Sequence, residues 1–180
     1  MQHNRTRVVL LVTLLSAASL AAQPRRELQV RLTEVPQGIR LDTIGRAEKI
    51  GAPLERTFDA VRKAYAEFEI ATNTESVQHG EIGNTALALR RRFAGERVSK
   101  SLDCGRGIAG DYADQYRLSV AVVTWVSPRA SAADSSTVHT ALVAGGRATD
   151  GATAWPLQCA SLGYFERKLA KRVRELAAAP

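Results

Sequence analysis

The residues of this chain whose types and spacing could do chemistry are few, and the first is a glycine pattern. Residues 105–110 read Gly-Arg-Gly-Ile-Ala-Gly and match G-x-G-x-x-G. That pattern holds a dinucleotide where it follows a buried parallel strand, opens a helix and precedes an acid about 20 positions on. Here the next segment has the composition of a strand, and beyond Asp114 the next acid is Asp134. We therefore expect a loop shaped by the neighbouring Cys104, and no bound cofactor.

The histidines and paired acids are the next candidates. A metal site needs three or four convergent ligands, yet beyond the N-terminal segment the chain has only His79, in a predicted turn, and His139, among Thr and Ser on a predicted strand. We expect both on the surface. Asp111 and Asp114 could form an acid pair, but we expect them to cap or solvate their loop. No G-x-S-x-G context supports a nucleophile, so we expect no catalytic or metal-ligating residue and a protein that is not an enzyme.

Cys104 and Cys159 are the only cysteines. In an oxidising compartment an even pair with no other partner most simply forms a disulfide. Closing a loop of this length restricts the unfolded chain by about 4 kcal/mol on the entropic account. Metal binding or a redox role is the alternative, which is less favoured because neither cysteine sits in a C-x-x-C pair and no histidine lies close to either in the sequence.

Two basic clusters remain, a run of three arginines and the polar face of the last predicted helix. A charged helix face is usually exposed to solvent without a binding role. The alternative is that these basic residues bind anionic lipid or an acidic envelope protein. Aromatic residues make up 6% of the chain and do not interleave with the basic ones, so no nucleic acid is expected. The candidate anionic-surface contacts are Arg90, Arg91, Arg92, Arg167, Lys168, Lys171 and Arg172.

The N-terminus has the features of a secretory signal peptide. Arg5 and Arg7 precede an uncharged apolar run over residues 8–20, which is shorter than the roughly 20 residues that span a bilayer. Small residues follow, the pattern that a signal peptidase reads. We expect a signal peptide over residues 1–22, cleaved after Ala21 or the alanine that follows it. An uncleaved N-terminal anchor is the alternative.

Cleavage of the signal peptide sets the charge, the compartment and the length expected of the mature protein. Removing the leader takes away two arginines and no acid, so the net charge falls from +7 to +5. No cysteine ends the apolar run, so we expect an exported protein of the periplasm or cell envelope without a lipid anchor. Residues 23–180 are enough for one domain with a real core, and a single α+β domain is the expectation.

Two segments repeat apolar residues at helical spacing, which predicts amphipathic helices over residues 53–69 and 158–177. Alternating or Val-rich segments predict strands at residues 28–33, 39–44, 116–126 and 137–144, with a hairpin over residues 70–93. Residues 128–136 and 145–153 are predicted loops, and the first of them joins the strands at residues 116–126 and 137–144 into a second hairpin. Because short links favour antiparallel pairing, we expect an antiparallel sheet of about four to six strands packed on one face by the two helices.

The layout resembles the helix-grip domains of BamC, an accessory lipoprotein of the outer-membrane protein assembly machinery. Residues 58–70, 80–93, 112–126 and 162–176 carry the likeness, which lies in layout and hydrophobic pattern. Residues 102–105 and 159–163 also look like segments of uncharacterised bacterial envelope proteins. The resemblance implies a non-enzymatic envelope interaction or accessory domain. It leaves open a carrier that holds an apolar ligand between helix and sheet.

Overall fold

The computed structural model describes residues 28–32, 35–41, 44–129, 132–150 and 153–179. The predicted signal peptide lies outside these ranges. In chain order the elements are β1 (Gln29–Leu32), β2 (Val35–Arg40), β3 (Arg46–Ile50), α1 (Leu54–Glu67), β4 (Thr74–Ser76), β5 (Glu81–Leu89), β6 (Arg92–Phe93), β7 (Glu96–Arg97), a 3-10 turn (Val98–Lys100), β8 (Leu102–Asp103), β9 (Arg106–Gly107), β10 (Gly110–Asp111), α2 (Tyr112–Gln115), β11 (Leu118–Arg129), β12 (Ala132–Asp150), β13 (Thr153–Ser161) and α3 (Tyr164–Ala178).

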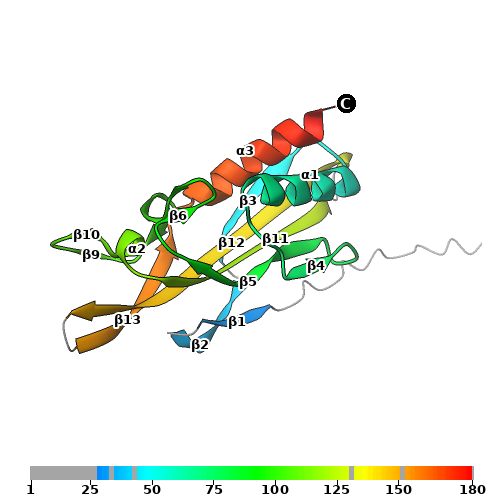
Figure 1. Cartoon of the computed structure of the whole chain (residues 1–180). Helices are drawn as coiled ribbons and strands as arrows, with labels where there is room; N and C mark the ends of the chain where they lie inside the picture. The colour runs from blue at the N-terminus through cyan, green and yellow to red at the C-terminus, as the bar shows by residue number, and fades with distance from the viewer. Residues whose placement is uncertain (1–27, 33–34, 42–43, 130–131, 151–152, 180) are drawn as a thin grey trace, which may run out of the picture.

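The fold is α+β, as predicted, and its centre is an antiparallel sheet of seven strands. The strand order is β4-β5-β11-β12-β13-β8, and β3 pairs with β12 off this path. Helices α1 and α3 lie together on one face of the sheet, and the β1–β2 hairpin lies on the other side (Figure 1). The sheet has more strands than expected because β3 was not anticipated and the two-residue strand β8 adds an edge. Within the described ranges no helix has the length and apolarity to cross a membrane.

The predicted hairpin of the two central strands is confirmed, but both predicted loops are too long, because β11 continues to Arg129 and β12 spans Ala132–Asp150. Their pairing runs from Leu118 opposite Gly146 to Arg129 opposite Ala132. Gly145 and Gly146, in the second predicted loop, lie within β12, and at Gly146 a side chain would not fit. A Cβ on Gly146 would lie 2.8 Å from Leu118 Cδ2 and 2.9 Å from the carbonyl oxygen of Arg117. Cross-strand packing therefore outweighs the low strand propensity of glycine.

The helices cover the sheet with a continuous apolar layer. Phe58 and Tyr65 of α1 and Phe165 of α3 are each at most 1% exposed. Phe165 packs against Phe93 with ring centroids 4.6 Å apart. The hydroxyl of Tyr65 lies 3.0 Å from Thr124 Oγ1 on β11, which satisfies a polar group that would be costly to bury alone.

The second helix starts later than the predicted residue 158. Residues 153–161 continue as β13, in which Cys159 lies opposite Ala144 of β12. Gly163, with φ of +70°, is the residue that precedes α3. Glycine adopts this left-handed conformation without the steric cost of a Cβ, so the change from strand to helix occurs there.

The face opposite the helices, called the open face here, is only partly covered. Val30, Leu32 and Leu41 of the N-terminal hairpin region form a second apolar cluster with residues of β11 and β12. The sheet residues in this cluster are Ala121, Val123, Trp125, Ala141 and Val143. The same face continues beyond this cluster toward the start of β11.

Candidate functional site

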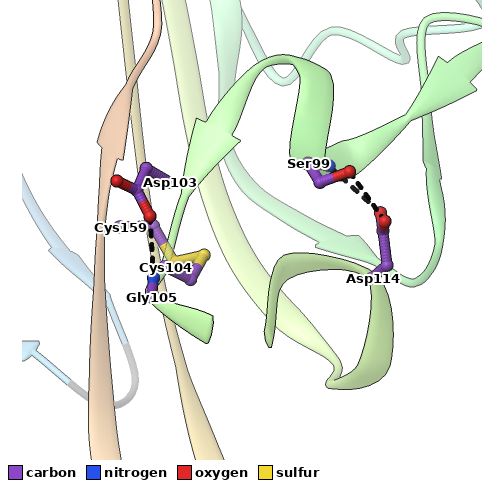
Figure 2. Close-up of a disulfide and its surroundings, with 6 residues drawn as sticks. All are labelled: Ser99, Asp103, Cys104, Gly105, Asp114 and Cys159. Atoms are coloured by element: carbon purple, nitrogen blue, oxygen red, sulfur yellow. Dashed lines mark hydrogen bonds between the residues drawn. A yellow bond between two sulfur atoms is a disulfide. The ribbon is translucent and has the colours of Figure 1, made fainter. Parts of the chain in front are cut away.

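The two cysteines are joined in a disulfide, with Sγ atoms 2.00 Å apart. Figure 2 shows the bond between Cys104, which follows β8, and Cys159 on β13. The ladder between these strands has only two residue pairs, Ala160 with Asp103 and Ser161 with Leu102. The covalent bond therefore holds the excursion between β5 and β11 against the sheet where backbone pairing is shortest.

Asp111 and Asp114 contact different partners. Asp114 accepts hydrogen bonds from the backbone N–H of Ser99 at 3.0 Å and from its hydroxyl at 2.7 Å (Figure 2). It also forms an ion pair with Arg97 at 2.7 Å. Burial is the largest single influence and raises the pKa of Asp114, but the bonds from Ser99 and Arg97 together outweigh it, and the pKa is lowered. Asp111 instead lies 3.1 Å from Arg106. Both acids therefore serve local structure.

The glycine pattern forms a small hairpin. β9 and β10 pair Gly110 with Gly107 and Asp111 with Arg106. The ring of Tyr112 packs so closely on Gly107 that a Cβ there would lie 2.7 Å from Cε1 of the ring. The next helix, α2, spans only four residues. The close contact with Tyr112 accounts for Gly107, and the long helix that a phosphate-binding turn requires is not present at this place.

The two histidines differ in burial. His79 is exposed, and its Nδ1 lies 2.9 Å from the hydroxyl of Ser76. The prediction of a surface His139 is wrong, because this residue is only 8% exposed and stacks on Trp125 with centroids 5.4 Å apart. Trp125 in turn donates its indole N–H to the buried Glu81 at 3.2 Å. Among the described residues no three His, Cys, Asp or Glu side chains form a metal-binding group.

Two of the four predicted contacts on α3 are already engaged within the protein. Arg172 binds both carboxylate oxygens of Glu67 and also Glu175, and the hydrogen bonds with Glu67 are the main reason that its pKa is raised. Lys168 donates to the carbonyl of Ala94 at 2.7 Å and lies over the ring of Phe68. The other two, Arg167 and Lys171, are exposed and form no ion pair with a described acid.

The arginine run spans the tight turn from the end of β5 to β6, where the backbone N–H of Arg92 donates to the carbonyl of Arg90 at 2.8 Å. The side chain of Arg92 donates to the carbonyl of Gly95 at 2.6 Å, next to the carbonyl that Lys168 binds. The turn between β6 and β7 therefore brings Arg92 close to the N-terminal half of α3. Arg91 has a positive φ of 68°. Arg90 directly follows β5 and belongs to a different surface.

That surface is a row of arginines from three neighbouring segments of the sheet, which local sequence patterns do not reveal. Leu118 lies opposite both Leu89 and Gly146. Arg117 directly precedes β11 and Arg90 directly follows β5. Arg90 and Arg117 line one hollow, and Arg117 and Arg147 line another. Arg117 has the same side-chain parity as Ala121 and Val123, and Arg147 the same parity as Val143, so they lie on the open face. We call Arg90, Arg117 and Arg147 the arginine row.

The row borders a hollow of about 570 Å³ on the open face. Arg31 of β1 lines this hollow together with Arg117, Arg147 and the stretch of β5 at residues 85–88. Arg90 and Arg117 also line a neighbouring hollow of about 480 Å³. Four arginines from four segments thus surround one part of the sheet surface, although they are far apart in the sequence.

The charges of this surface are less balanced than those of the helix layer. Arg31, Arg90 and Arg117 form no ion pair with any carboxylate that the structure describes, whereas on the helices Arg62 and Arg174 pair with Glu75 and Glu48. Like charges opposite each other on neighbouring strands are destabilising. Guanidinium groups bind carboxylate or phosphate in a bidentate manner. The arrangement is therefore suited to bind an anion.

Comparison of the chain with protein-family models, with curated protein sequences and with solved structures finds no match.

Proposed function

We propose that this protein is an exported, disulfide-stapled, non-enzymatic interaction domain of the bacterial cell envelope, and that it binds an anionic partner through the arginine row. The observation that carries the proposal is the placement of Arg90 and Arg117 side by side, without a carboxylate partner among the described residues, at the edge of an open hollow. A surface of this kind attracts carboxylate or phosphate groups and repels cations.

The predicted signal peptide and the disulfide are the two features that favour an oxidising compartment. A signal peptide would deliver the chain to an oxidising space, and a disulfide persists in such a space. The resemblance to BamC-type helix-grip domains favours a role in binding a partner rather than in catalysis.

A carrier role is less well supported. The space between helices and sheet, where a helix-grip fold would hold an apolar ligand, is occupied by the protein's own Phe58, Tyr65 and Phe165. These side chains make ordinary core contacts, and moving them aside would expose apolar surface to water. We therefore favour a surface interaction.

Binding of the mature domain to two anionic probes tests the proposal. The probes are phosphatidylglycerol vesicles and polyglutamate, compared with phosphatidylcholine vesicles and polylysine. We expect the anionic probes to bind and the R90Q/R117Q variant to lose about tenfold or more in affinity for the probe that binds. A K63Q/K171Q variant removes the same charge from the helix layer and is the matched control, with an expected loss below about twofold.

Equal losses in the two variants would show that net charge alone directs binding. Failure of the wild-type domain to bind any anionic probe at low salt, where charge attraction is least screened, would overturn the proposal. The vesicle and polyglutamate arms distinguish a phosphate-bearing lipid from a carboxylate-bearing polypeptide.

A further inference from the structure

An unpaired strand edge lies beside the arginine row. β4 pairs only with the first part of β5, from Ser76 opposite Glu81 to Thr74 opposite Gly83. Just beyond, the side-chain oxygen of Asn73 accepts a hydrogen bond from the backbone N–H of Thr85. That of Asn84 accepts one from the backbone N–H of Ala86. Past that point, residues 86–89 have no strand neighbour on their outer side within the described part of the chain.

This edge lacks the usual protection against pairing with other chains. Natural edge strands commonly carry a charged side chain or a proline that prevents further strand addition, but residues 86–89 read Ala-Leu-Ala-Leu. Ala86 and Ala88 are exposed on the open face. Leu87 and Leu89 are half-buried and pack at the border of the helix-layer core. A further strand placed here would find small residues on one face and apolar ones on the other.

We propose that this edge of β5 binds an extended acidic segment of a partner polypeptide by strand addition. The inference rests on the proposed function, because it assigns the partner of the same arginine row. Side chains alternate between the two faces of a strand. In the bound segment, acidic side chains therefore face Arg90 and the rest of the row, and the apolar side chains between them cover Leu87 and Leu89.

The edge favours a polypeptide over a lipid headgroup. An open strand edge presents backbone N–H and C=O groups that another backbone can pair with, and this pairing provides affinity in strand addition. A headgroup supplies acceptors for arginine but no ladder for the strand.

N-methylation of a probe peptide tests the pairing directly. The probe is a peptide of about eight residues that alternates Val and Glu, long enough for one strand. Two derivatives carry N-methyl groups, one on every Val nitrogen and the other on every Glu nitrogen. In an added strand only one of these two sets faces β5. We expect one derivative to lose at least about tenfold in affinity and the other less than about threefold.

The outcomes separate the two proposals. Strand addition would be overturned if the unmethylated peptide and its two N-methylated derivatives bound with affinities within about threefold of one another, or if the two derivatives lost affinity equally. Either result would leave anion binding intact. Vesicle binding without peptide binding would also overturn it and assign the row to a lipid. No binding of any anionic probe would remove the proposed function itself. A dimer of the free domain whose β5 amides are protected would assign the edge to a second copy of the chain and overturn the inference.

Hydrogen exchange locates the bound peptide. On addition of the Val-Glu peptide, the outward-facing amides among residues 87–89 are expected to gain protection of about tenfold or more, whereas the amide of Ala86 already donates to Asn84. The R167Q/K171Q variant, which removes two exposed charges from α3, is expected to bind like wild type. Protection confined to α3 would place the peptide on the helix layer and contradict the inference.

Discussion

The guanidinium of Arg172 on α3 joins the two helices by binding both carboxylate oxygens of Glu67 on α1, with Nη2 2.8 Å from Oε1. A bidentate pair fixes the relative position of two elements more strictly than a single contact does. It also means that Arg172, one of the candidate contacts for an anionic surface, already has an anionic partner within the protein.

Replacing this arginine tests that assignment. R172Q is expected to lower the melting temperature slightly, because the pair is solvent-exposed and such pairs contribute little. It is expected to bind polyglutamate within about twofold of wild type. E67Q, which removes the other partner, serves as the control and should give a similar melting temperature. A loss of about tenfold in R172Q binding would place Arg172 at the binding surface.

The disulfide is expected to contribute to stability through the unfolded chain. With a sequence separation of 55 residues, its loss in a C104S/C159S variant should lower the free energy of unfolding by about 4 kcal/mol. Chemical denaturation with and without reductant measures this. Reductant should destabilise the wild type and leave the variant unchanged. A wild type that is insensitive to reductant under denaturing conditions would contradict the presence of the bond.

Asp114 makes a pH-dependent contribution. Because its pKa is lowered in the folded protein, its stabilising effect is fully present above the unfolded-state pKa of about 4 and is lost as the pH falls through the folded-state value. D114N should therefore lower the free energy of unfolding by about 1 to 2 kcal/mol at neutral pH. The difference from wild type should shrink at acidic pH.

Denaturation of both proteins at neutral and acidic pH measures that difference. D111N is the matched control, since Asp111 forms only an exposed ion pair with Arg106 and should have a smaller effect. A D114N deficit that is the same at both pH values would show that the carboxylate charge does not matter.

The close approach of β11 and β12 predicts a cost for a small side chain. G146A places a methyl group against Leu118 and the carbonyl of Arg117, and overpacking of this kind costs about 1 to 3 kcal/mol. G51A is the matched control, because nothing lies within 4 Å of its added Cβ. Thermal denaturation of the two variants compares them, and equal stability would contradict the tight strand contact.

Local patterns in the sequence predicted the two helices and the sheet that they cover, but not the separate β1–β2 hairpin on the other face or the register of the strands. The helical spacing of apolar residues predicted α1 and α3 because each helix buries one continuous face. The extent of β12 was missed because its glycines are favourable only when β11 lies directly against them. His139 was misplaced for a similar reason. Its Thr and Ser neighbours suggest an exposed strand, yet Trp125 on the adjacent strand covers it.

The arginine row could not be predicted because it depends on register. In the sequence, Arg117 and Arg147 are single basic residues 30 positions apart, whereas Arg90 belongs to a run of three arginines that is visible as a local pattern. Pairing of β5, β11 and β12 brings one arginine from each segment to the same level of the sheet. Non-local pairing of this kind is not encoded in local spacing. The signal that was present is the absence of an acid within two positions of Arg117 or Arg147 in the sequence.

The central claim is that Arg90 and Arg117 contact an anionic partner, and side-chain NMR of the wild-type domain measures it most directly. The Nε–Hε signals of these two arginines are assigned with the single variants R90Q and R117Q. On addition of polyglutamate we expect both signals to shift in proportion to binding, while that of Arg167 on α3 stays in place. A shift of Arg167 with no change at Arg90 and Arg117 would contradict the account.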